Sequence, residues 1–207
     1  MSVIAVDAMG GDSAPGEVVE GAVLAANDGI EVVLVGDESQ ITSILSGRGS
    51  DLRIHHASEV IDFHDDPAHA IREKRDSSIV VAAKLVKSGG ADAFVSAGAT
   101  GAAMAAATFL IGRLPGVDRP GIASIFPTGQ VVLDVGANLE CRPEHLVQFA
   151  VMGRALASVY RHIEDPTVGL WNIGEEASKG RAVERAAQAM LERTEGLRFI
   201  GNVEGRD

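Results

Sequence analysis

Ala91-Asp92-Ala93-Phe94-Val95-Ser96-Ala97-Gly98-Ala99-Thr100-Gly101 is the stretch that decides the fold, and an uncharged run over residues 102–111 follows it. Phe94 and Val95 are typical of a buried strand, and the two glycines allow a sharp turn and the close approach of a ligand. The uncharged run predicts a helix that is buried on nearly all sides. Because the first N–H groups of a helix have no partner within it, the turn predicts an anion site, although a plain strand-to-helix turn would have the same composition.

The alternation of strand and helix continues in both directions along the chain. This alternation is typical of a mostly parallel sheet with helices on both faces, and we expect one α/β domain over residues 1–207. Ser13 is a candidate N-cap for the first helix, residues 114–119 read as a linker, and residues 76–78 leave open whether the helical pattern around them is one helix or two. Strands are predicted at 2–7, 30–35, 52–56, 91–96, 120–126, 131–135, 167–173 and from 197, and helices at 16–27, 38–46, 68–87, 102–113, 143–161 and 182–195.

Composition and charge exclude some classes of function. The formal net charge of -11 argues against non-specific binding of nucleic acid, which needs a basic surface. Cys141 is the single cysteine, so an internal disulfide is impossible and a reducing compartment is expected. No secretory signal is visible, and the uncharged run is too short to span a bilayer, so the sequence indicates a soluble cytoplasmic protein.

Four Gly-rich turns follow predicted strands, at residues 7–12, 96–101, 134–138 and 172–180. Ligands of open α/β sheets bind at the carboxyl ends of the strands, where these turns would gather. The glycines expose backbone N–H groups, which suits a phosphate or an oxyanion. Lys179 is the only lysine in these turns, and the hydroxyls of Ser96 and Thr100 could donate hydrogen bonds to phosphate.

Other candidate sites also have ordinary structural explanations. The basic cluster near residue 74 reads first as a solvated helix face, and Cys141, with only Arg142 as a visible basic neighbour, reads as structural rather than reactive. Residues 62–66 could hold a cation or form a flexible polar loop. Ser96 lacks the context of a catalytic nucleophile, the histidines lack zinc-binding spacing, and no dinucleotide or Walker motif is found. The residues alone therefore predict an α/β enzyme that binds a small anion such as phosphate, with no metal.

Several motifs resemble the bacterial phosphate acyltransferases of phospholipid synthesis, the PlsX family. They lie in order along the whole chain, which makes the resemblance specific. The family's turn Ser-Ala-Gly-Asn-Thr-Gly has Ala99 in place of Asn here, and family members continue beyond residue 207, so we expect the chain to be incomplete at its C-terminus. The motifs are Ala5-Val6-Asp7-Ala8-Met9-Gly10-Gly11-Asp12, Val35-Gly36-Asp37, Ser96-Ala97-Gly98-x-Thr100-Gly101, Gly112-Arg113, Asp118-Arg119-Pro120, Leu133-Asp134-Val135-Gly136-Ala137-Asn138, Pro143-Glu144-His145-Leu146-Val147-Gln148, Asn172-Ile173-Gly174-Glu175-Glu176, Lys179-Gly180 and Phe199-Ile200-Gly201-Asn202-Val203-Glu204.

The resemblance implies a three-layer α/β/α fold like that of the isopropylmalate dehydrogenases. It implies transfer of a fatty acyl group from acyl carrier protein to inorganic phosphate, which gives acyl phosphate for phospholipid synthesis. It also implies a cytoplasmic homodimer that can contact the membrane peripherally and needs no cofactor. Because phosphate is itself the nucleophile, the protein has only to hold it near the thioester carbonyl and to stabilise the tetrahedral oxyanion.

The resemblance also assigns expected roles to residues. Lys179 would neutralise phosphate or the oxyanion, with Asp7 and Asn138 as the other catalytic residues. The helix at 102–111 would line an acyl groove or pack in the core. Phosphate would be bound by Ser96, Gly98, Thr100, Gly101, Gly10 and Gly11, the substrate rim would be Asn172, Gly174 and Glu175, and the acidic carrier protein would dock on Arg72, Lys74, Arg75 and Arg113.

Two other functions stay open. A dehydrogenase on the related fold would need an Asp-bound divalent metal and a nicotinamide site, and neither motif is found. A non-catalytic scaffold that binds the acyl carrier or a lipid would fit Ala99 and the length of the chain. Binding without turnover would identify the scaffold, and a nicotinamide cofactor or divalent cation that raises the melting temperature would identify the dehydrogenase.

Overall fold

The computed structural model describes residues 2–48 and 51–206, and its contacts divide the chain into two compact units. Unit 1 is Met1–Arg113 and unit 2 is Leu114–Asp207. The boundary falls at the start of the predicted linker at 114–119. The expectation of one domain over residues 1–207 stays a prediction.

Unit 1 is built on a four-stranded parallel sheet with the order β3-β2-β1-β4. The register places Asp7, the last residue of β1, beside Ser96, the last residue of β4. The turns that follow these two strands therefore begin side by side. The elements are β1 (Val3–Asp7), α1 (Gly16–Asn27), β2 (Glu31–Gly36), α2 (Glu38–Arg48), β3 (Arg53–His56), α3 (Pro67–Glu73), α4 (Ser78–Ser88), β4 (Ala93–Ser96), α5 (Thr100–Ala106) and the π-helical turn η1 (Ala107–Ile111).

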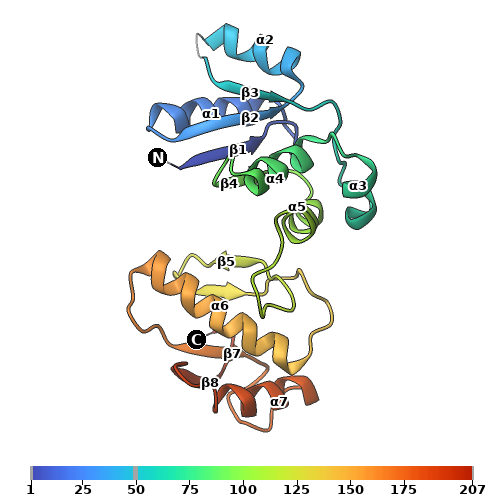
Figure 1. The fold of residues 1–207 in the computed structure, drawn as a ribbon. Helices are drawn as coiled ribbons and strands as arrows, with labels where there is room; N and C mark the ends of the chain where they lie inside the picture. Colours follow the sequence, from blue (N-terminus) through green and yellow to red (C-terminus); the bar gives the residue numbers. More distant parts are fainter. Residues whose placement is uncertain (1, 49–50, 207) are drawn as a thin grey trace. The chain divides into compact units, whose positions relative to one another are not determined.

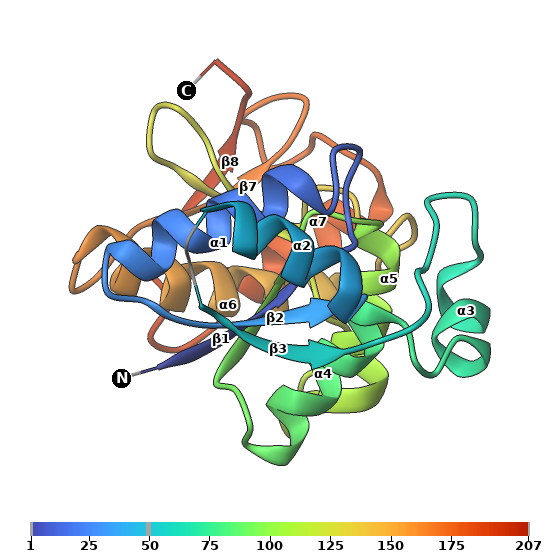
Figure 2. The ribbon, with the colours of Figure 1, turned by 90° about the horizontal axis from the view of Figure 1, so that it is seen from above.

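Helices cover both faces of this sheet, as Figures 1 and 2 show for α1 and α2 on one side and α4 on the other. Leu34 of β2 packs with α1 and α2, whereas Val35, the next residue, packs with α4. This alternation follows from the period of two along a strand and explains the continuous apolar run of β2. A third buried cluster joins α3, α4 and α5.

Three local expectations for unit 1 were wrong. Val95 is 55% exposed, because β4 lies at the edge of the described sheet. The helix at 102–111 is not buried on nearly all sides: its alanines pack on one face, and Phe109 is 58% exposed. Ser13 does not cap α1, whose N-cap is Pro15; only the Ser13 carbonyl contributes, by accepting the N–H of Glu17.

The helical pattern at 68–87 forms two helices, α3 and α4, and Ser77 occupies the N-cap position of the second. Its hydroxyl donates to the carbonyl of Lys74 at 2.8 Å instead of capping α4. Asp66 caps α3 by accepting the N–H of His69 at 2.8 Å. The question left open by the sequence is therefore answered by a break after residue 73.

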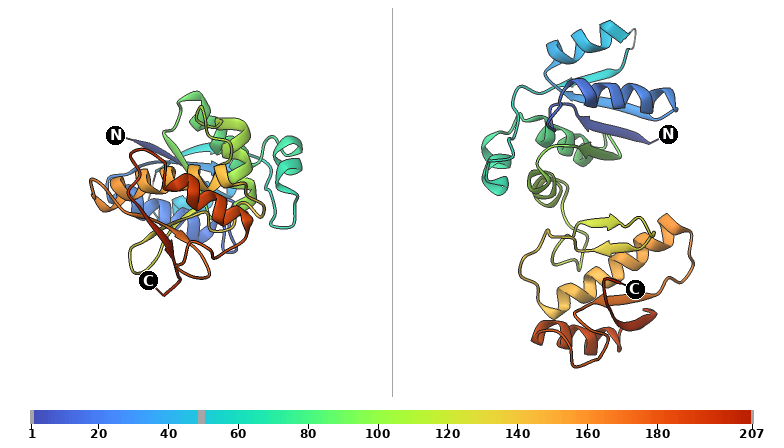
Figure 3. Two further views of the ribbon diagram at one scale, coloured as in Figure 1. Left: turned by 90° about the horizontal axis from the view of Figure 1, so that it is seen from below. Right: turned by 180° about the vertical axis from the view of Figure 1, so that it is seen from behind.

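Unit 2 contains two small sheets, with β5 and β6 antiparallel and β7 and β8 parallel. The long helix α6 packs against β6, β7 and α7, and Figure 3 shows it running along the β5–β6 hairpin. No helix in residues 2–48 and 51–206 is both long and apolar enough to cross a membrane. The elements are β5 (Ala123–Ile125), β6 (Val131–Leu133), α6 (Pro143–Arg161), β7 (Val168–Trp171), α7 (Ala182–Leu191) and β8 (Phe199–Val203).

Candidate functional site

In unit 1, the turns after β1 and β4 are joined through Asp7, which is only 2% exposed. The Ser96 hydroxyl donates to Asp7 Oδ2 at 2.7 Å and accepts the N–H of Gly98 at 3.1 Å. Asp7 Oδ1 accepts the N–H of Met9 at 3.2 Å. The Ser96 hydrogen is therefore directed at a buried carboxylate, and a phosphate could take it only by breaking that bond.

Gly10 and Gly98 are required by the close approach of these two turns. A Cβ at Gly10 would lie 2.5 Å from Asp7 Oδ2 and 2.9 Å from Ser96 Oγ. One at Gly98 would lie 3.1 Å from the Cα of Gly10, and Gly11 has a φ of +118° beside Ala97. Protein atoms fill the space beside Gly10, so the absence of a side chain there serves packing first.

The start of α5 lacks a side-chain cap. Ala99 is its N-cap, with φ -61° and ψ 111°, and no side-chain bond reaches the first N–H groups. Thr100 is exposed, and its hydroxyl has no partner within the part of the chain that the structure describes. Gly101 gives room to the ring of Pro67, whose Cγ would lie 2.8 Å from a Cβ at this position.

The residues expected to dock the carrier protein differ in their availability. Lys74 binds Asp65 and the carbonyl of Val60, and its hydrogen bond lowers the pKa of Asp65. Arg72 is exposed, with its guanidinium 5.8 Å from the ring centre of Phe109. Arg75 is exposed and donates through Nε to the carbonyl of Arg72 at 3.0 Å. Lys74 thus holds the loop at 62–66, whereas Arg72 and Arg75 lie at the surface, as does Arg113.

In unit 2, Asp134 organises the turn that carries Asn138. Its carboxylate accepts the backbone N–H groups of Ile122 at 2.8 Å, Ala137 at 3.1 Å and Asn138 at 2.8 Å. Burial raises the pKa of Asp134, but the hydrogen bonds from Ile122, Asn138 and Ala137 outweigh it, so the pKa lies below its ordinary value. The Asn138 amide donates to Asp134 Oδ2 at 3.0 Å and to the carbonyl of Pro120 at 2.8 Å. Both amide hydrogens of Asn138 are therefore used within the fold, and only its oxygen is left for a ligand.

Lys179 lies on the turn between β7 and α7, with its side chain 44% exposed. Its nearest carboxylate is Glu176, with Nζ and Oε2 3.7 Å apart, which is a weak surface pair. Gly174 allows the loop to close, because a Cβ there would lie 2.9 Å from Lys179 Cγ. Glu175 reaches Arg206 at 3.8 Å.

Three buried or half-buried amides hold this turn in place. Asn172 donates to the carbonyl of Lys179 at 3.3 Å and to Asn202 Oδ1 at 3.2 Å. Asn202 in turn donates to the carbonyl of Glu176 at 3.0 Å and to Gln188 Oε1 at 3.0 Å. Sequence reasoning gave no role to Asn202, Gln188 or Asp134. The only signal for Asp134 was an Asp at a strand end before a Gly-rich turn, which is typical of a side chain that binds its own backbone.

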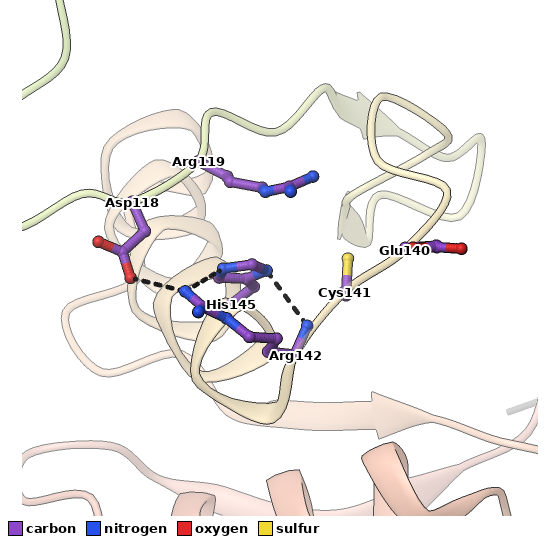
Figure 4. A pocket seen from close by; sticks show the side chains of 6 residues that line it. All are labelled: Asp118, Arg119, Glu140, Cys141, Arg142 and His145. Carbon is purple, nitrogen blue, oxygen red and sulfur yellow. Dashed lines mark hydrogen bonds and ion pairs between the residues drawn. The ribbon is translucent and has the colours of Figure 1, made fainter.

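A polar pocket of about 420 Å³ lies at the start of α6, entirely within unit 2 (Figure 4). Burial and the Asp134 carboxylate raise the pKa of the Cys141 thiol, against the opposing effects of Arg119 and Arg181. A thiol with a raised pKa is poorly nucleophilic, which fits a structural role. No group of three or more metal-ligating side chains occurs within residues 2–48 and 51–206. The pocket is lined by Asp118, Arg119, Glu140, Cys141, Arg142 and His145.

The predicted residues are thus gathered in two sets, one in each unit. Asp7, Gly10, Gly11, Ser96 and Gly98 come together in unit 1. In unit 2, Lys179 shares a turn with the expected rim residues, while Asn138 belongs to the separate turn of Asp134.

Comparison with known proteins supports one family over the whole chain. The family described as "Fatty acid synthesis protein" matches residues 2–207. A "Phosphate acyltransferase" of Desulforamulus reducens is 51% identical over 213 residues, which covers 100% of this chain and 64% of the relative. Proteins of the same name from Pelotomaculum thermopropionicum and Geobacter sulfurreducens are 51% and 52% identical, and each alignment covers 99% of this chain and 61% of the relative. The chain therefore spans about three fifths of the length of these relatives, and it belongs to the fatty acid synthesis protein family, in agreement with its resemblance to the bacterial phosphate acyltransferases.

Proposed function

We propose that this protein transfers a fatty acyl group from acyl carrier protein to inorganic phosphate. The observation that carries the proposal is the identity of about one half, along the whole chain, to proteins named phosphate acyltransferase. In the reaction, a phosphate oxygen attacks the thioester carbonyl carbon, and the new C–O bond forms as the carbonyl becomes an oxyanion. The C–S bond then breaks, the carrier thiolate leaves and takes a proton, and acyl phosphate is released.

This reaction requires the protein to supply charge and to position the reactants, and it does not require a covalent nucleophile. We infer that Lys179 neutralises phosphate or the oxyanion, since its ammonium is exposed and only weakly paired. Asp7 and Asn138 are inferred to act through other residues: Asp7 fixes Ser96, and Asn138 closes the Asp134 turn. The turn at 96–101 would meet phosphate through the Thr100 hydroxyl and backbone N–H groups, and Asn172, Gly174 and Glu175 would shape the rim.

We also propose an overall three-layer α/β/α fold like that of the isopropylmalate dehydrogenases, and a homodimer in the cytoplasm that can contact the membrane peripherally. Helices lie on both faces of the unit 1 sheet, and this arrangement supports the proposed three-layer fold. The acidic carrier protein would dock on Arg72 and Arg75, whose side chains lie at the surface, and on the exposed Arg113, which follows η1 in the sequence. Charge reversal at Arg72 and Arg75 is expected to raise the KM for the carrier, and sedimentation velocity tests the dimer.

The direct experiment is a phosphate-dependent assay of this chain with long-chain acyl carrier protein, in which hydroxylamine traps acyl phosphate as a hydroxamate. Hydroxamate that appears only with enzyme and phosphate would support the proposal. Consumption of the thioester without phosphate dependence would contradict it, because water would then be the acceptor. Binding of the acyl carrier with no turnover would favour the scaffold function instead.

A further inference from the structure

The pocket at the start of α6 contains an unusual arrangement of hydrogen-bond donors. His145, the third residue of α6, is only 3% exposed. Its Nδ1 lies 3.2 Å from the backbone nitrogen of Arg142, and its Nε2 lies 3.1 Å from Arg142 Nη2 (Figure 4). A backbone N–H can only donate, so Nδ1 must be the acceptor and the hydrogen of the neutral ring must sit on Nε2.

The consequence is that two donors face each other. Arg142 Nη2 carries hydrogens and has no acceptor capacity, and His145 Nε2–H has none either in this tautomer. The Arg142 side chain is 67% exposed and can donate to solvent, but His145 is buried, and a buried donor without an acceptor is costly. The Nε2–H of His145 therefore calls for an acceptor, and the 3.1 Å contact places Arg142 Nη2 where it can share that acceptor. Arg119 extends toward the same pocket and adds a second guanidinium.

We propose that Arg119, Arg142 and His145 form a binding site for a phosphate-type oxyanion. An oxyanion offers several acceptor lone pairs, and guanidinium groups bind it with directed, charge-assisted hydrogen bonds. The volume of about 420 Å³ exceeds what a single ion needs and lies in the range of small-molecule sites. The same chemistry could therefore come from free inorganic phosphate or from the phosphate of a larger ester.

Two carboxylates that line the pocket reduce its positive charge. Asp118 Oδ2 lies 3.6 Å from Arg142 Nη2 and neutralises part of its charge, and Glu140 lines the far side, with its carboxylate directed away from His145. Among the residues that line the pocket, two arginines and two carboxylates balance in formal charge, and outside the lining Glu144 Oε2 lies 4.0 Å from Arg142 Nε. Affinity would thus depend on the directed donors rather than on net charge, and Asp118 would compete with the ligand for Arg142.

The site differs from the residues assigned to acyl transfer and is tested without any acyl donor. We would label the protein with 15N-histidine and follow His145 by NMR while adding inorganic phosphate, sulfate or methyl phosphate. We expect the Nε2–H tautomer in the free protein and a saturable shift of Nε2 upon titration. A protonated Nδ1, or no saturable shift with any of the three anions, would overturn the proposal in the unaltered protein, whatever its acyltransferase activity.

Substitutions then test which side chains donate hydrogen bonds to the anion. Arg119→Ala and Arg142→Ala are each expected to weaken phosphate binding at least tenfold, and Asp118→Asn to strengthen it several-fold by releasing Arg142. Arg193→Ala, which removes an exposed arginine of the same unit, is the matched control and should leave affinity unchanged. Tighter binding of methyl phosphate than of phosphate would identify an ester as the ligand, and the reverse would identify the free ion. Equal affinities in the two arginine variants and the unaltered protein would refute the assignment.

Discussion

Unit 1 and unit 2 hold their polar turns in different ways. Unit 1 has three clusters of buried apolar side chains, and its turns meet where glycines allow close packing. No such cluster occurs in the described residues of unit 2, 114–206, where a cavity of about 1020 Å³ opens among the strands and helices. Hydrogen bonds also join the turns of unit 1, through Asp7 and Ser96, but the turns of unit 2 depend on the hydrogen bonds of Asp134 and Asn202 without such apolar clusters beside them.

One chain can thus hold candidate functional residues largely by packing in one region and largely by polar networks in another. Polar networks are sensitive to charge and pH, because each buried group must keep its partners. Packed glycine turns are sensitive to volume. The following changes test this contrast, in order of expected effect.

Lys179→Ala should have the largest effect, on activity rather than on stability. Loss of one charge-stabilising group in the transition state typically reduces turnover by about 10²–10³-fold, or about 3–4 kcal/mol. The melting temperature should hardly change, since the pair with Glu176 is long and exposed. Steady-state assays of acyl phosphate would measure the loss, and Lys179→Arg should recover part of it. In unit 1, Thr100→Ala should cost less than tenfold; a larger loss than for Lys179→Ala would reverse the roles of the units.

Asp134→Asn should destabilise unit 2 by about 2–4 kcal/mol, because an amide NH2 would face the donors of Asn138. The pKa of Asp134 is lowered from its ordinary value of 3.8, so its stabilisation is present above about pH 4 and lost as the pH falls below that value. Trp171 is the single tryptophan and lies in unit 2, so urea unfolding followed by its fluorescence reports on this unit. The variant should lose stability at pH 7 and show a flatter dependence between about pH 5 and pH 3. An unchanged dependence would mean that other carboxylates control acid stability.

Gly10→Ala should destabilise unit 1 by about 1–3 kcal/mol, because its Cβ would lie 2.5 Å from the buried Asp7 carboxylate. Gly21→Ala is the matched control: nothing lies within 4 Å of a Cβ there, and alanine should stabilise the interior of α1 by about 0.5–1 kcal/mol. Far-UV circular dichroism measures both variants. If Gly10→Ala moves the Trp171 transition by the same amount, the two units unfold together and the contrast between them does not extend to stability.

Asn202→Asp should destabilise the turn of Lys179 by about 1–2 kcal/mol, since it replaces the donor to Glu176 and Gln188 by an oxygen. The KM for phosphate should rise more than kcat falls, because the turn would be misplaced rather than stripped of its lysine. Asn27→Asp, at the exposed end of α1, controls for the added charge. The expected loss of stability together with an unchanged KM for phosphate would limit Asn202 to a structural role.

Much of the fold could be predicted from the sequence, because in several elements the apolar pattern begins or ends where glycine or proline residues mark a turn. The strand of β2 and the helices α1 and α6 appear where apolar runs, Gly-rich turns and Pro143 placed them. Val95 was misjudged because no local pattern tells an edge strand from a central one. The long-range partners of Asp134 and Asn202 were missed for a related reason: Ile122 and Glu176 are 12 and 26 positions away, and only the folded chain brings them near.

Ala99→Asn should have the smallest effect and tests the start of α5, which has no side-chain cap. Ala99 already has the extended conformation of an N-cap but offers no acceptor to the first N–H groups of α5. An Asn there should accept one of them and stabilise unit 1 by about 1 kcal/mol, which circular dichroism in urea would detect. Ala99→Ser, a cap of similar strength with a different side chain, separates capping from substrate contact. If both variants gain stability and keep the same activity, residue 99 acts on the helix; if only Asn raises activity, its amide contacts the substrate.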